Sequence, residues 1–201
     1  MKVVLASKNP HKLVEIRQIT DRFGFELVLQ SELGVDIDVE ETGTTFEENS
    51  LLKAKAVMEA TGLPALADDS GIAVDALNGE PGVYSARYAG GHDDADNNKK
   101  LLEKMKDVPD EKRTGHFVSV IACVFPDGTE LVARGECPGK ILWDYRGNGG
   151  FGYDPLFLYE PMDKTFAEMN AEEKNGISHR ANAMAKFAVI FAEEINKRKN
   201  K

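Results

Sequence analysis

A mixed α/β fold is predicted by three features of the sequence. Short strand-like apolar runs alternate with segments whose apolar residues recur at helical spacing, as where "KVVLA" is followed by "KLVEIRQI". Two longer strand-like runs, "HFVSVIACVF" and "TELVARGEC", flank the tight turn "PDG" and predict an antiparallel hairpin. The chain closes with a long amphipathic helical segment. A length of 201 residues suits one domain or two intimately joined lobes.

The first helix follows the strand "KVVLA" through the loop "SKNPHK". Asn9 is a good N-cap, Pro10 suits the first helical turn, and Gly24 is expected to end the helix. One face of this helix carries four apolar residues, Leu13, Ile16, Ile19 and Phe23. The run "FELVL" predicts the next strand.

The second helix is predicted by the capping-box spacing of Thr45 and Glu48, and Gly62 and Pro64 stop it. The segment "ALADDSGIAVDAL" predicts a strand, a kink and a second strand, and residues 93–106 are expected to be helical. The final helix is expected to start at Ser178. Its apolar side comprises Met184, Phe187, Ala188, Phe191 and Ile195.

The charge and hydropathy of the chain exclude several classes of partner. A net charge of -9 opposes non-specific binding to nucleic acid or to an anionic membrane. No apolar run approaches the roughly 18 residues that span a bilayer, and the N-terminal run is too short for a signal peptide. We therefore expect a cytoplasmic protein. Cys123 and Cys137 show neither disulfide nor metal-site spacing and are expected to be reduced thiols.

Cationic residues crowd the start of two predicted helices, where the helix dipole is already positive. Lys8, His11 and Lys12 stand at the first helix, and His179 and Arg180 at the last. An anion bound there, such as a phosphate chain, would make both arrangements favourable. The alternative is that these are solvated surface charges.

Acidic residues form the complementary pattern. Asp68 and Asp69 stand side by side between apolar runs, where carboxylates are costly unless they are paired or bind a metal. A second acidic group precedes the second helix and consists of Asp36, Asp38, Glu40 and Glu41. Convergence of the two groups would create an oxygen-only site suited to Mg²⁺ and the phosphates of a substrate. The alternative for the second group is a solvated loop.

The glycine-rich stretch "GNGGFGYDP" has two interpretations. It is either a flexible loop with Phe151 filling the core, or a loop whose glycines let the backbone approach a flat ligand on which Phe151 stacks. The chain contains neither a Walker A motif nor a G-x-S-x-G nucleophile elbow. P-loop and serine-hydrolase chemistry are therefore not expected.

Five blocks in order resemble the inosine triphosphate pyrophosphatase family: "SKNPHK", "EETGTTFEENSLLKA", "LADDSGIAVDALNGEPGVYSARYAG", "GGFGYDPLF" and "KNGISHRANAM". The resemblance implies a long curved mixed β-sheet flanked by helices, in a single domain over residues 1–201 with two lobes and a central cleft. It also implies Mg²⁺-dependent hydrolysis of inosine, deoxyinosine and xanthosine triphosphates to monophosphate and pyrophosphate. Members of the family are typically homodimers.

The resemblance also assigns roles by motif position. Asp69 would be the general base, supported by Asp68, and Glu40 or Glu41 together with Asp69 would hold the metal. The residues expected to contact the triphosphate are Ser7, Asn9, Lys12 and Lys53. Other residues expected to bind the substrate are Lys8, Pro10, His11 and Ser70. Those expected around the base are Phe151, Gly152, Tyr153, Asp154, Lys174, His179 and Arg180. Family members often carry Thr-Gly where this chain has Ser7-Lys8.

Two other functions compete with this one. A related house-cleaning pyrophosphatase would act on pyrimidine or modified nucleotides, although the "SHR" and "GFGYDP" blocks favour the purine enzyme. A non-catalytic sensor would hold a metal-bound triphosphate without cleaving it, but the intact acidic pair favours an enzyme.

Overall fold

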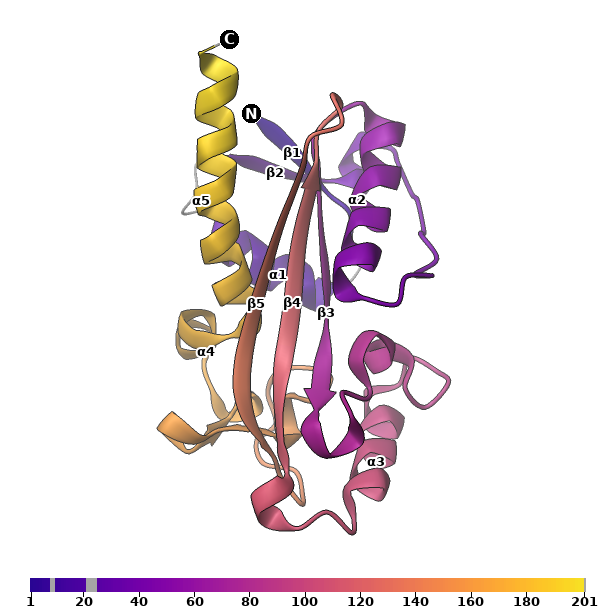
Figure 1. Ribbon diagram of the computed structural model, residues 1–201, viewed down its shortest axis with the longest axis vertical. Coiled ribbons are helices and arrows are strands. Elements are labelled where there is room, and N and C mark those ends of the chain that lie inside the picture. Colours follow the sequence, from indigo (N-terminus) through magenta and orange to yellow (C-terminus); the bar gives the residue numbers. More distant parts are fainter. Residues whose placement is uncertain (8–9, 21–24, 201) are drawn as a thin grey trace. The chain divides into compact units, whose positions relative to one another are not determined.

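The computed structural model describes residues 1–7, 10–20 and 25–200, and within them the strands form one seven-stranded sheet in the order β2-β1-β3-β4-β5-β6-β7. The strands are β1 (Lys2–Leu5), β2 (Glu26–Leu29), β3 (Ala65–Val74), β4 (Thr114–Val124), β5 (Glu130–Ile141), β6 (Phe157–Tyr159) and β7 (Lys164–Thr165). The helices are α1 (Pro10–Thr20), α2 (Phe46–Thr61), α3 (Asp94–Met105), α4 (Ala171–Ile177) and α5 (His179–Lys199) (Figure 1). β1 pairs in parallel with β2 and β3, whereas β5–β6 and β6–β7 are antiparallel, so the predicted mixed α/β class is confirmed.

Two compact units make up the chain, and each is assembled from separate segments. The first unit comprises Met1–Asp69, Ser119–Gly135 and Arg180–Lys201, and the second comprises Ser70–Val118 and Glu136–His179. The chain therefore passes from one unit to the other four times, inside β3, β4 and β5 and at the start of α5. The single domain with a central cleft that the resemblance implies stays a prediction.

In the first unit, alternate strand residues face two separate hydrophobic cores. Leu5 of β1 packs with Ile16 of α1 and Phe187 of α5, whereas its neighbour Val4 packs with Val57 of α2. This division follows from the two-residue period of a strand, which sends successive side chains to opposite faces. Figure 1 accordingly shows α5 and α2 on opposite sides of this part of the sheet.

Helix α2 begins and ends as its sequence predicts. The Thr45 hydroxyl accepts from the backbone N–H of Glu48 at 3.1 Å, and the Glu48 carboxylate accepts from the Thr45 N–H at 3.2 Å. Gly62 follows in the left-handed conformation with φ 66°, which favours glycine. The predicted cap Asn9 and the predicted stop Gly24 of the first helix lie outside the described residues.

The kink predicted within residues 65–77 is wrong, because β3 runs unbroken from Ala65 to Val74. Gly71 lies inside this strand for a different reason. A Cβ atom at Gly71 would come within 2.4 Å of both the Gly82 carbonyl oxygen and the Ser85 hydroxyl. The glycine therefore permits a close approach of the segment Gly82–Arg87 to the strand.

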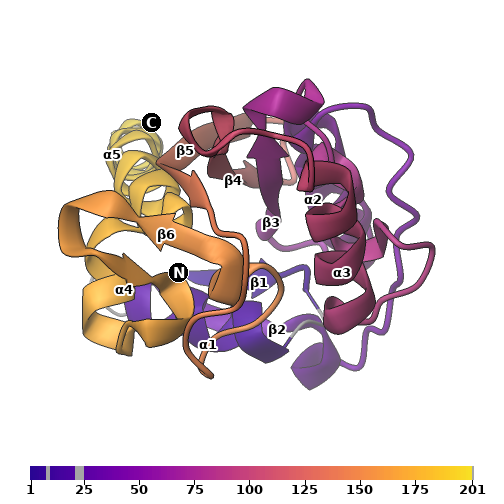
Figure 2. The same cartoon turned by 90° about the horizontal axis from the view of Figure 1, so that it is seen from below.

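The second unit has its own core, to which α3 contributes Leu101 and Met105. Helix α3 lies on one side of this unit, and β6 and α4 lie on the other (Figure 2). The short helix α4 was not predicted, and α5 begins at His179, one residue after its predicted start.

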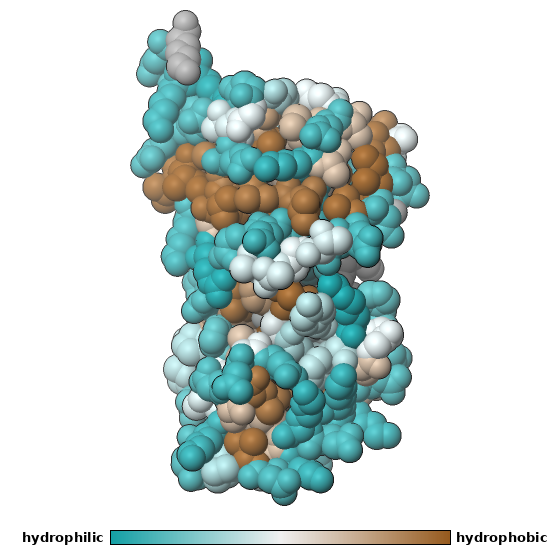
Figure 3. Space-filling model, turned by 45° about the vertical axis from the view of Figure 1, so that its right-hand side comes forward, coloured by the Kyte–Doolittle hydropathy of each residue, from teal (hydrophilic) through white to brown (hydrophobic). Residues whose placement is uncertain are grey.

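Hydrophobic side chains gather in a band across the face of the molecule that Figure 3 presents. The large hydrophobic residues exposed in the first unit include Leu33, Leu52 and Val132. No helix in the described part of the chain combines the length and hydropathy needed to cross a bilayer.

Candidate active site

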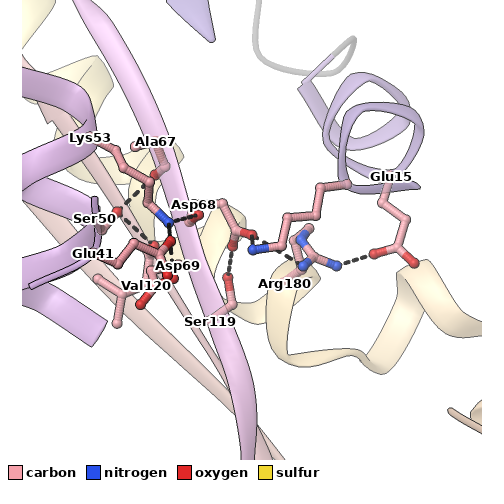
Figure 4. Close-up of polar contacts among 11 residues, drawn as sticks. Glu15, Glu41, Ser50, Lys53, Ala67, Asp68, Asp69, Ser119, Val120 and Arg180 are labelled. Atoms are coloured by element: carbon pink, nitrogen blue, oxygen red, sulfur yellow. Dashed lines mark hydrogen bonds and ion pairs between the residues drawn. The ribbon is translucent and has the colours of Figure 1, made fainter. Parts of the chain in front are cut away.

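Asp68 and Asp69 leave β3 on opposite sides of the strand (Figure 4). Both are buried, with exposed fractions of 2% and 4%. Because successive residues of a strand face opposite ways, the two carboxylates meet two different sets of partners. Together these partners form what we call the charged network, which comprises Lys12, Glu15, Glu41, Lys53, Asp68, Asp69 and Arg180.

Asp68 is held by one hydroxyl and two cations. The Ser119 hydroxyl donates to one carboxylate oxygen at 2.5 Å, while Lys12 Nζ and an Arg180 guanidinium nitrogen lie 3.0 and 3.2 Å from the other. Arg180 also pairs with Glu15. Burial opposes ionisation of Asp68, but the charges of Arg180 and Lys12 outweigh it and hold the pKa of this carboxyl well below its usual value. Asp68 is therefore ionised at neutral pH.

Asp69 lies beside a lysine that it shares with Glu41. Lys53 Nζ is 2.9 Å from Asp69 Oδ1, 2.6 Å from Glu41 Oε1 and 3.1 Å from the Asp68 carbonyl oxygen, which fills its three donor positions. Burial raises the pKa of Asp69 against the opposing charge of Lys53. Asp69 Oδ2 is buried and has no partner in the described part of the chain. Asp69 can therefore accept a proton on Oδ2.

Glu41 and Asp69 supply the oxygen donors that a hard divalent cation prefers. Glu41 is half-buried and meets Asp69 through Lys53, whereas the Glu40 side chain is exposed. No group of three or more metal-ligating side chains occurs among the described residues. Mg²⁺ commonly uses only one or two carboxylates and takes its other ligands from water and substrate phosphates, so the carboxylates of Glu41 and Asp69 fit such an ion.

The predicted substrate contacts at the first helix and in β3 are only partly within the described residues. Lys8 and Asn9 lie outside them, as do the side chains of Pro10 and His11. Ser7 is half-buried after β1, and Ser70 is half-buried in the part of β3 that belongs to the second unit.

Among the residues at the predicted helix starts, His179 and Arg180 are buried and Lys12 is half-buried. The Lys12 side chain is 15% exposed, and His179 and Arg180 are 4% and 1% exposed. The surface-charge interpretation is therefore wrong for these three. In the acidic segment, Asp36 and Asp38 are exposed, as the solvated-loop alternative expects.

In the second unit, the glycine-rich loop (residues 150–154) is organised by a buried ion pair. Asp154 Oδ2 accepts from Lys174 Nζ at 2.7 Å and from the Phe151 N–H at 2.9 Å. Lys174 Nζ also lies 4.9 Å from the centre of the half-buried Phe151 ring, which is cation–π geometry. Gly150 has φ 73°, and a Cβ there would come within 2.1 Å of Asp154 Oδ2, so the loop requires glycine.

Of the two aromatic residues in this loop, Tyr153 fills the core. Its ring is buried, its hydroxyl donates to the Ser85 carbonyl oxygen at 2.8 Å, and burial raises its pKa above the usual value. Tyr153 therefore anchors the loop, which leaves Phe151 as the aromatic residue with an exposed edge.

His179 belongs to an aromatic stack in the second unit. Its ring lies 4.8 Å from that of Phe117, nearly parallel at 15°, and 6.2 Å from that of Phe166 at 9°. Lys174 Nζ is 5.5 Å from the Phe166 ring centre. Lys174 thus lies against both Phe151 and Phe166, and Phe166 in turn stacks on His179. Arg180 instead joins the charged network, and its expected contact with a base stays a prediction.

Three site residues were missed by sequence reasoning. Glu15 pairs with Arg180, and Ser119 donates to Asp68. The Ser50 hydroxyl lies 3.0 Å from the carbonyl oxygens of Ala67 and Val120 and so docks α2 on β3 and β4. For Glu15, the only available signal was its position one helical turn after Lys12.

One protein-family model matches nearly the whole chain. Residues 3–190 match the model of the Ham1 family. The chain belongs to the Ham1 family. Its relatives include a "dITP/XTP pyrophosphatase" of Clostridium perfringens, which is 50% identical over 193 residues covering 92% of this chain and 95% of the relative. A protein of the same name from Symbiobacterium thermophilum is 53% identical, with 92% of each chain covered. The resemblance stated from the five sequence blocks is confirmed.

Solved structures of Ham1 proteins share the fold. The Ham1 protein of Staphylococcus aureus superposes with a TM-score of 0.86 at 42% identity, covering 96% of this chain and all of that one. The HAM1 protein of Coxiella burnetii gives a TM-score of 0.87 at 41% identity, covering 96% of this chain and 99% of the other.

Proposed function

We propose that this Ham1-family protein is a nucleoside triphosphate pyrophosphatase that hydrolyses dITP, ITP and XTP to the monophosphate and pyrophosphate. The single observation that carries the chemistry is Asp69, a buried carboxylate with one oxygen held by Lys53 and the other uncommitted. The substrate class comes from relatives of about half-identical sequence that are named dITP/XTP pyrophosphatase.

Asp69 acts as the general base. Its Oδ2 takes one proton from a water molecule, and the oxygen of that water attacks the α phosphorus. The bond from the α phosphorus to the oxygen that bridges the α and β phosphates breaks, so pyrophosphate leaves with the bridging oxygen. A general base of this kind contributes roughly 10²–10⁴-fold to the rate. Lys53 holds the other oxygen of Asp69 and so keeps the base aimed in one direction.

The triphosphate carries about four negative charges, which must be offset before an anionic nucleophile can approach. Lys12 and Lys53 supply positive charge in the first unit. We propose that Glu41 and Asp69 hold Mg²⁺, with Glu40 the other candidate expected from the sequence. When bound, the metal supplies a Lewis acid that offsets phosphate charge and lowers the pKa of bound water.

The second unit supplies recognition of the base. Phe151 offers a half-buried ring on which a purine can stack, Lys174 adds a polar group beside it, and His179 lies in the adjoining aromatic stack with Phe166. Inosine and xanthosine present an oxygen at position 6 of the purine, where adenine has an amino group. A site that donates a hydrogen bond there rejects adenine by roughly 10⁴-fold, because the mismatch leaves polar groups unpaired.

We also propose a cytoplasmic homodimer. The band of hydrophobic side chains in Figure 3 supports a contact between copies of the chain. Analytical ultracentrifugation tests this part, and a single species at the monomer mass of 22.1 kDa would contradict it.

The function is tested by pyrophosphate release from dITP, ITP, XTP, dATP, dGTP and dTTP, each with and without Mg²⁺. We expect release from the first three, and only when Mg²⁺ is present. Preference for dTTP would instead identify a pyrimidine house-cleaning enzyme. Tight binding of dITP with no release would identify a nucleotide sensor.

A further inference from the structure

Helix α3 holds a single residue of the glycine-rich loop by both of its backbone groups. The Gly152 N–H donates to Asp94 Oδ2 at 2.7 Å, and Asn98 Nδ2 donates to the Gly152 carbonyl oxygen at 2.8 Å. Asp94 and Asn98 are four residues apart, so they lie on the same face of the helix one turn from each other. Together they act as a clamp on Gly152.

The clamp restrains a residue whose backbone is otherwise unusually free. Gly152 adopts φ 59°, a left-handed conformation that favours glycine, and it is half-buried. A glycine has more backbone freedom than any other residue, because it lacks a Cβ. The two hydrogen bonds to α3 restrict that freedom.

Phe151 is the residue on which this restraint acts. Its own N–H is bonded to Asp154, and the residue that follows it is held by α3. On the far side of Gly152, the Tyr153 hydroxyl is bonded to the Ser85 carbonyl oxygen. Hydrogen bonds on both sides of Phe151 thus restrain the direction in which its ring projects, together with the contact between the ring and Lys174.

The cost of burying Asn98 indicates that its bond to Gly152 matters. Asn98 is 3% exposed, and its Oδ1 has no partner within the described residues. A buried amide is costly unless it is bonded, and the donor bond to Gly152 is the contact that offsets this cost. The neighbouring Asn97 anchors the same helix turn by accepting from the Ala89 N–H at 2.7 Å.

We propose that Asp94 and Asn98 are positioning residues that orient Phe151 and thereby set the discrimination among bases. The inference deepens the proposed function and rests on it, because it assumes that Phe151 stacks on the purine. Neither residue belongs to the charged network, so their effect is confined to the base and leaves phosphate binding unchanged.

Four variants test the clamp. Asp94→Ala and Asn98→Leu each remove one of its bonds, Asp94→Asn keeps an oxygen that can accept from Gly152, and Lys99→Ala changes an exposed residue of the same helix. We expect KM for dITP to rise roughly 10-fold in Asp94→Ala and Asn98→Leu, the scale of one lost hydrogen bond, with kcat within about threefold of the original. Asp94→Asn should recover most of the loss, and Lys99→Ala should behave as the unaltered enzyme.

Two further readouts separate positioning from general damage. The preference for dITP over dGTP should fall in Asp94→Ala and Asn98→Leu, whereas the inhibition constant of inorganic tripolyphosphate, which has no base, should stay unchanged. A rise in that constant in parallel with KM would overturn the proposal. So would a KM and a base preference within about twofold of the original in both variants.

The design distinguishes this proposal from the function on which it rests. If the unaltered enzyme releases no pyrophosphate from dITP, the proposed function fails. If it does so and Asp94→Ala shows no selective loss, only the clamp fails. Because Asp94 is exposed, its variants remain informative even where Asn98→Leu does not fold.

Discussion

The charged network of the first unit and the glycine-rich loop of the second bury charge in different ways. In the first unit, Asp68 and Asp69 meet Lys12, Lys53 and Arg180 directly, side chain to side chain. The loop has one buried ion pair, Asp154 with Lys174, and is otherwise held by backbone hydrogen bonds and aromatic rings (residues 150–154). Under the proposed function, the charged network suits a highly charged phosphate chain, whereas the aromatic ring of the loop suits a flat base.

The largest effect is expected where the first unit depends on a charge for its stability. Asp68→Asn leaves Lys12 and Arg180 without their shared carboxylate, and breaking a buried pair costs about 3–5 kcal/mol. For a chain of this size we expect the melting temperature to fall on the order of 10 °C. Asp38→Asn, at an exposed aspartate of the same unit, is the control. A melting temperature as high as that of the control would contradict the prediction.

The stabilising effect of the Asp68 carboxylate should depend on pH. Because the pKa of Asp68 is held below its usual value, its carboxylate stabilises the fold fully above the pKa of an unfolded aspartate, and this contribution is lost as the pH falls toward the folded pKa. The difference in unfolding free energy between the original protein and Asp68→Asn should be constant above about pH 5 and shrink below about pH 4. Urea unfolding at several pH values measures it.

The next largest effect separates the two neighbouring aspartates. Asp69→Asn keeps the shape of the side chain but removes the base, so kcat should fall by at least roughly 10²-fold. The melting temperature should change little, because burial disfavours the Asp69 charge and Lys53 keeps two other oxygen partners. Because the two aspartates lie on different faces of β3, we expect Asp68→Asn to lower the stability and Asp69→Asn to lower the rate. An unchanged kcat would remove Asp69 from the reaction.

A smaller effect is expected from Phe151→Ala in the second unit. Loss of the stacking surface should raise KM for dITP by roughly 10-fold. Lys12→Met should instead act on the phosphates. It should weaken inhibition by tripolyphosphate more than it alters the preference among bases. Steady-state kinetics with dITP, dGTP and tripolyphosphate compare the two variants. Equal effects of both variants on both readouts would mean that the two regions do not divide the substrate between them.

The smallest effect concerns the thiols, of which each unit has one. Cys123 lies in a core of the first unit and Cys137 in the core of the second, and burial raises the pKa of each to about 12. Both should therefore resist a thiol reagent at neutral pH until their own unit opens. Labelling followed by mass spectrometry compares the opening of the two units, and immediate labelling of either cysteine in the native protein would contradict this prediction.

Local signals predicted the fold well because they depend on residues close in sequence. The capping box of Thr45 and Glu48, the hairpin turn and the left-handed Gly62 each involve a few neighbouring positions. Helix α4 carried a similar signal, since Asn170 and Glu173 form a capping box of their own, but Gly176 obscured the short helix. The kink was wrong because Gly71 serves a close approach that no local pattern reveals.

The site was predictable in its residue types and much less so in its pairings. The two-residue period of a strand puts Asp68 and Asp69 on opposite faces, but the predicted kink hid this arrangement, and the partners of both residues are distant in sequence. Ser119 and Arg180 are 51 and 112 residues away from Asp68. Such pairings follow from the strand order of the whole sheet, which composition and spacing do not specify.

Because the backbone crosses from one unit to the other at four points, neither unit corresponds to a continuous stretch of sequence. A single proteolytic cut or gene truncation cannot release either unit intact. Recombination that exchanged one unit for a homologous one would have to join several fragments at once. If the charged network acts on the phosphates and the glycine-rich loop on the base, as we propose, the two functions are inherited together, and a change of specificity is expected to arise by point substitution rather than by exchange of a unit.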